Sequence, residues 1–172
     1  MDYDNSLKMT LIFSEEKEPF LLDVTSLLYD FELMHDLVLL VYSKEYSEYV
    51  FTNRFYYRTG RPLEKQHRLR AVKIVKKSPL IIEVSMAVGA LWAFIQAIEK
   101  ISNWKINKEK LRLEVEKLKL DIYKEKRELE KELLEREVQL YYDNMKKRLE
   151  DNPIKLIDIS IEKPEDERDY TN

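Results

Sequence analysis

Alternating apolar and polar positions mark the first strand that the chain predicts. Leu7, Met9, Leu11 and Phe13 fall at every second position, a spacing typical of a strand with one buried face. A charged turn follows, and residues 19–22 are expected to return as a short second strand. This part of the chain therefore predicts paired strands.

The period of the apolar residues changes after Asp23, whose carboxylate is expected to cap the start of a helix. From there, large apolar side chains recur at steps of three and four residues, which is the spacing of one helical face. We expect a helix over about residues 24–42, with this face against the sheet. Its members are Leu27, Phe31, Met34, Val38 and Val41.

Residues 43–66 are rich in aromatic side chains but show no sustained period. We expect an irregular segment there, with one strand near residues 49–57. Leucine and β-branched residues then predict strands over residues 67–76 and 80–84. Pro79 helps to separate these two strands, because proline cannot donate a ladder hydrogen bond.

An almost entirely apolar helix is expected next, over residues 86–102, with Ser85 as its N-cap. Its apolar part is about 20 Å long, short of the ~30 Å hydrocarbon core of a bilayer. A strand followed by a buried helix is therefore the first interpretation, and membrane contact through residues 79–98 is an alternative. Small residues at four-residue steps would let this helix pack closely against the sheet or a second copy. They are Gly89, Ala93 and Ala97.

Residues 105–150 contain no glycine or proline and are dominated by strong helix formers. We expect one helix of about 46 residues, roughly 70 Å long. Apolar residues recur along it at eleven-residue spacing, which predicts a coiled-coil-like surface that pairs with another helix. A single solvated helix is the alternative. The predicted interface residues here are Leu111, Val115, Leu118, Ile122, Leu129, Leu133 and Leu140.

Together these elements predict an α+β fold. A small, mainly antiparallel sheet is packed by two helices, and a long projecting helix and a short C-terminal strand near residues 154–161 follow it. Residues 1–104 form the expected globular head, and residues 105–150 form the charged amphipathic helix. Residues 151–172 contain the short strand and an acidic tail that we expect to be disordered.

Candidate chemistry is sparse. The 172 residues include no cysteine and two glycines, which excludes disulfides, thiol catalysis and a glycine-rich phosphate loop. Glu32 and His35 form half of a carboxylate-bridged metal site, but no second Glu-x-x-His pair occurs, and His67 lies in a basic segment. We therefore expect no enzyme activity, no cofactor and no metal. Residues 1–8 lack the features of a secretory signal, so a cytoplasmic location is expected.

The basic segment is a stronger indication of a partner. Residues 54–77 contain nine lysines and arginines against one acid, interleaved with aromatic residues. Such a segment suits single-stranded nucleic acid, an acidic protein or a lipid surface. The alternative is that its cations neutralise acids of the long helix or of the tail. The predicted partner-binding residues are Arg54, Arg58, Arg61, Arg68, Arg70 and Lys73.

Residues 54–120 also resemble a set of small uncharacterised bacterial proteins. The resemblance rests on the order of three segments: RTGRPLEKQHRLRAVKI, SPLIIEVSMAVGALWAFIQAIEKI and NWKINKEKLRLEVEKLKL. They correspond to an Arg-rich strand, a Ser-Pro-Leu step with an apolar helix, and a long charged helix. The resemblance implies a bacterial or phage-related source, and it implies neither a defined activity nor any functional residue.

These features favour a non-enzymatic interaction or scaffold protein that forms a homo-oligomer through its long helix. Its basic segment is expected to contact a partner, possible partners being an acidic protein or, as a second choice, nucleic acid. One alternative function is a nucleic-acid-binding module that uses residues 54–77. Another is a membrane-associated adaptor that uses residues 79–98.

Overall fold

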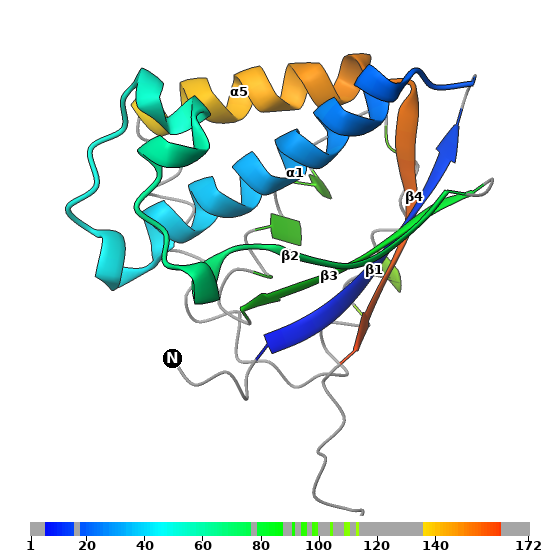
Figure 1. Ribbon diagram of the computed structural model, residues 1–172, viewed down its shortest axis with the longest axis horizontal. Helices are drawn as coiled ribbons and strands as arrows, with labels where there is room; N and C mark the ends of the chain where they lie inside the picture. Colours follow the sequence, from blue (N-terminus) through cyan, green and yellow to red (C-terminus); the bar gives the residue numbers. More distant parts are fainter. Residues whose placement is uncertain are drawn as a thin grey trace, which may run out of the picture.

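A computed structural model shows an α+β fold (Figure 1). It describes residues 6–15, 18–76, 79–87 and 136–162. The remaining described positions are residues 91, 94, 95, 98, 99, 104, 109, 110 and 113. Over these residues the protein has a four-stranded antiparallel sheet and two regular helices, which confirms the predicted α+β class and antiparallel sheet. The second regular helix comes from the predicted 105–150 helix and not from residues 86–102.

The sheet has the strand order β2-β3-β1-β4, and each neighbouring pair is antiparallel. The strands are β1 Ser6–Glu15, β2 Arg70–Lys76, β3 Leu80–Ala87 and β4 Ile154–Glu162. In β1 the four alternating residues Leu7, Met9, Leu11 and Phe13 are all buried, which confirms the predicted inward face. Strand β1 lies in the interior of the sheet, between β3 and β4.

Helix α1, Leu21–Tyr42, begins earlier than predicted, so the expected strand over residues 19–22 and the N-cap at Asp23 are both wrong. Asp23 lies in the first turn, where its carboxylate accepts a hydrogen bond of 2.8 Å from the backbone N–H of Phe20. A carboxylate at the third helical position stabilises the helix start by reaching back in this way. The apolar run Phe20 to Leu22 is exposed, so its hydrophobicity does not indicate a buried strand.

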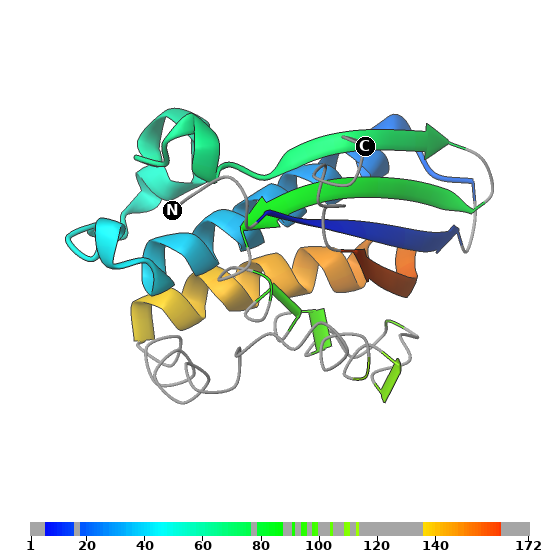
Figure 2. The ribbon, with the colours of Figure 1, turned by 90° about the horizontal axis from the view of Figure 1, so that it is seen from below.

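Helix α5, Arg136–Asp151, runs beside α1 on one side of the sheet (Figures 1 and 2). Val138, Tyr141, Met145 and Leu149 are its buried residues, and their spacing of three and four places them on one helical face. This part of the predicted 105–150 helix therefore packs on the domain and does not project from it. Of the preceding residues 105–135, only 109, 110 and 113 belong to the described chain, and they are helical.

The predicted helix over residues 86–102 begins later than expected. Strand β3 continues through Ser85 to Ala87 because β1 pairs with it that far, with Lys8 opposite Ser85 and Ser6 opposite Ala87. Ser85 is therefore a strand residue and not a helix N-cap. The described positions 91, 94, 95, 98 and 99 are helical, and the four apolar ones among them are buried. Within the described segments, no helix has the length and apolar character needed to cross a bilayer.

Residues 43–69, between α1 and β2, are called the turn segment. They form four short 3-10 turns, so the strand predicted near residues 49–57 is wrong. They are η2 Lys44–Tyr46, η3 Asn53–Tyr56, η4 Arg58–Gly60 and η5 Lys65–His67. Contacts with α5 hold this segment in place: the ring of Tyr141 lies 5.1 Å from that of Phe55 and 5.2 Å from that of Tyr56. These long-range aromatic contacts explain why a strand-like sequence forms compact turns.

Gly60 is required for the close approach of η4 to η3. A Cβ atom at this position would lie 2.1 Å from the carbonyl oxygen of Arg54, which is backbone and cannot swing away. We expect Gly60→Ala to lower the free energy of unfolding by about 1–3 kcal/mol, the usual cost of overpacking. Urea unfolding followed by circular dichroism measures this cost, and an unchanged midpoint would contradict the expected clash.

Candidate functional site

The structure divides the predicted basic residues between surface and interior. Arg54, Arg58, Arg70 and Lys73 are exposed, and Arg68 is half-buried. Two of the exposed cations lie 3.6 Å from acids of the same domain: Arg58 from Glu32 on α1, and Lys73 from Glu83 on β3. These two acids belong to α1 and β3.

Arg61 does not belong to an exposed basic face, so its prediction as a partner-binding residue is corrected. It is 3% exposed, and its guanidinium forms an ion pair with the buried carboxylate of Asp36. His35, which is fully buried, places its Nδ1 atom 3.1 Å from the other Asp36 oxygen. A charged residue enters a core only with such a partner, because an unpaired buried charge is strongly destabilising.

The buried cluster of His35, Asp36 and Arg61 retains free hydrogen-bonding groups. The Nε and Nη2 atoms of Arg61 and the Nε2 atom of His35 have no hydrogen-bond partner in the described part of the protein. In the Glu-x-x-His motif, His35 contacts Asp36 and Glu32 contacts Arg58. This cluster anchors the turn segment to α1 at the middle of the domain.

A second ion pair joins α1 to α5. Arg148 donates from Nε to a carboxylate oxygen of Asp30 at 2.9 Å, and its Nη2 donates to the same oxygen at 2.5 Å. Burial raises the pKa of the Asp30 carboxyl, although the hydrogen bonds and charge of Arg148 act to lower it. This ion pair joins the two helices, and we assign it a structural role.

A small apolar cavity of about 210 Å³ lies between α1 and the β2 side of the sheet. Leu28, Phe31, Ile74 and Ile82 are among its lining residues, and the Arg58–Glu32 ion pair contributes its charged part. Ile74 is exposed although it pairs with the inward-facing Ile82, because α1 does not cover strand β2 completely. The cavity has no nucleophile and no metal-binding side-chain cluster among these residues.

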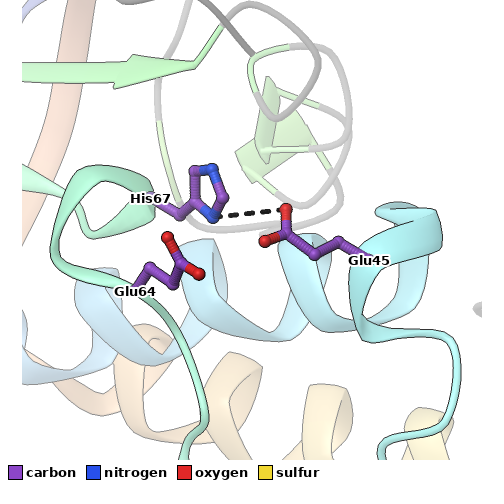
Figure 3. A group of neighbouring side chains, drawn as sticks. All are labelled: Glu45, Glu64 and His67. Carbon is purple, nitrogen blue, oxygen red and sulfur yellow. Dashed lines mark ion pairs between the residues drawn. The ribbon is translucent and has the colours of Figure 1, made fainter.

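A cluster of titratable side chains lies at the other end of the turn segment (Figure 3). Glu45 on η2, Glu64 just before η5 and His67 on η5 each point one potential ligand atom toward the others, and these atoms lie within 4.8 Å of one another. The Nδ1 atom of His67 is 3.7 Å from a carboxylate oxygen of Glu45. This cluster is not evident from the sequence, because His67 lies in a basic segment and the two acids are 19 positions apart.

The predicted self-association residues lie mostly outside the described chain. This holds for Gly89, Ala93 and Ala97 on the apolar helix, and for Leu111, Val115, Leu118, Ile122, Leu129 and Leu133 on the charged helix. Leu140 is described, and it is 62% exposed on α5. It is therefore the one member of the predicted interface that the structure places.

Comparison of the chain with models of protein families, with curated proteins and with solved structures gives no significant match. The fold and the arrangement of these residues are therefore the basis for any functional argument.

Proposed function

We propose that the protein is a non-enzymatic interaction protein that self-associates through the helix predicted over residues 105–150. The observation that carries this proposal is the position of Leu140. Its side chain is largely exposed, whereas Val138, Tyr141, Met145 and Leu149 on the same helix are buried. An exposed leucine on an otherwise charged helix face marks a surface that gains free energy when a partner covers it.

Helix geometry connects Leu140 with the predicted interface. At about 100° per residue, Leu140 lies on the side of α5 opposite its buried face. Residues eleven apart on a straight helix differ by only about 20° in direction, so a continuous helix would place Leu118 and Leu129 on the side of Leu140. The apolar track of the charged helix would then face away from the domain and be available to a second copy.

The basic residues support this proposal more than they support nucleic-acid binding. Arg58, Arg61 and Lys73 have acidic neighbours within the domain, which leaves fewer charges for a phosphate backbone. An acidic protein that contacts the exposed residues Arg54 and Lys65 remains part of the proposed partner set.

We expect the native protein to be an oligomer and Leu118→Glu with Leu129→Glu to dissociate it, because each change would place a charge in an apolar helix pair. Leu140→Glu alone is expected to weaken association without loss of the fold, since this side chain does not contribute to the core. Light scattering coupled to gel filtration measures the mass of each variant.

Val50→Glu is the matched control, because Val50 is an exposed apolar residue of the turn segment and not of the charged helix. It should leave the mass of the oligomer unchanged. A monomeric native protein at concentrations of tens of micromolar, or an unchanged mass of the double variant, would show that self-association through this helix is wrong.

A further inference from the structure

The cluster of Glu45, Glu64 and His67 brings together the two ends of the turn segment, at η2 and η5. Glu45 follows directly after α1, and Glu64 and His67 directly precede β2 (Figure 3). The two carboxylates are exposed, but the His67 side chain is only 9% exposed. A nearly buried imidazole beside two exposed carboxylates offers one fixed nitrogen and two oxygen ligands to a metal ion.

Tyr46 fixes the orientation of this imidazole. Its buried hydroxyl group lies 2.5 Å from Nδ1 of His67 and accepts a hydrogen bond of 3.2 Å from the backbone N–H of Glu64. The two rings also meet edge to face, with centroids 5.8 Å apart. One tyrosine therefore holds both the imidazole and the backbone of one of the two acids, and its hydroxyl would have to leave Nδ1 for a metal ion to bind that atom.

We propose that Glu45, Glu64 and His67 bind one divalent transition-metal ion of the zinc type. One imidazole and two carboxylates are ligands that suit Zn²⁺, whereas Mg²⁺ and Ca²⁺ prefer oxygen ligands alone. The ion would take the position at Nδ1 of His67 that the Tyr46 hydroxyl now occupies. Bond lengths of about 2.0–2.2 Å require the ligand atoms to move closer than they now lie, which the exposed glutamate side chains can do.

Such an ion would connect the end of α1 to the start of β2. It would close the turn segment at both ends and stabilise the folded state, because the unfolded chain does not hold these ligands together. This inference is independent of the proposed self-association, since none of its residues belongs to the 105–150 helix. The protein would carry a structural metal clamp, with any remaining coordination position taken by water.

Zinc titration of nitrogen-15-labelled full-length protein, followed by NMR of the histidine rings, tests the site directly. The chain has two histidines, so the fully buried His35 is an internal reference. We expect Nδ1 of His67 to shift on addition of one molar equivalent of zinc while the His35 signals stay in place. Unchanged His67 signals in excess zinc, or equal changes at both rings, would overturn the proposal.

Glu45→Gln with Glu64→Gln should weaken zinc binding at least about tenfold by calorimetry, because an amide oxygen is a poorer ligand than a carboxylate. Both side chains are exposed, so we expect the double variant to fold, which circular dichroism checks. Glu48→Gln is the matched control, an exposed acid three positions after Glu45, and should bind zinc as the native protein does. Native affinity in the double variant would show that zinc binds elsewhere.

Discussion

Asp36→Ala is expected to lower the free energy of unfolding by about 3–5 kcal/mol, because it leaves the guanidinium of Arg61 buried without a counter-charge. Both side chains are almost completely inaccessible to solvent, at 4% and 1% exposure. Two donor atoms of Arg61 already lack a partner among the described residues, so no second acid is in place to replace Asp36. Urea unfolding followed by circular dichroism measures the loss.

Arg58→Ala is the control for Asp36→Ala. Arg58 also pairs with an acid of α1, but its side chain is 68% exposed, and exposed pairs contribute only about 0–1 kcal/mol. The double replacement Asp36→Leu with Arg61→Met should recover part of the stability lost in Asp36→Ala, because it removes both buried charges. An equal loss for Asp36→Ala and Arg58→Ala would contradict the importance of burial.

Phe31→Ala is the second change with a large expected effect, again about 3–5 kcal/mol, the usual cost of removing a buried phenylalanine. Phe31 contacts three other rings that come from different parts of the core. Their centroids lie 5.7 Å away for Phe13 on β1, 5.5 Å for Phe94 and 5.8 Å for Trp104. The cavity left by alanine would loosen the contact between α1, the sheet and the described residues after β3.

The same urea titration compares Phe31→Ala with Tyr57→Ala, which removes an exposed aromatic ring from the turn segment. Tyr57→Ala should change the free energy of unfolding by no more than about 0.5 kcal/mol. Similar losses in the two variants would mean that the Phe31 cluster is not central to the core.

The sequence predicts correctly those elements in which apolar residues recur at a regular spacing. The alternating residues of β1 are buried, and so are Leu27, Phe31, Met34 and Val38 of the predicted face of α1. Residues 33–40 of α1 are nevertheless all buried, because α5 packs beside this helix as well. Element ends were less predictable. Ser85 could cap a helix or continue a strand, and its pairing with Lys8 on β1 decides for the strand.

The candidate sites were harder to predict because their contacts are long-range. In the sequence, Arg61 is one more cation of a basic segment. Only its ion pair with Asp36 on α1 shows that it is buried. Glu45, Glu64 and His67 meet because 3-10 turns fold the intervening chain back on itself, and those turns depend on aromatic contacts with Tyr141. No local pattern in the sequence indicates the Arg61–Asp36 pair or the cluster of Glu45, Glu64 and His67.

The place of β1 in the sheet has a consequence for synthesis of the protein. Strand β1 is made first among the described elements, yet one of its two neighbours is β4, which is made last. While the chain emerges from the ribosome, one edge of β1 keeps its backbone N–H and C=O groups unpaired until residues 154–162 arrive. Completion of the sheet is therefore a late event that depends on contacts distant in sequence, and contacts of this kind form slowly and leave the growing chain prone to aggregation.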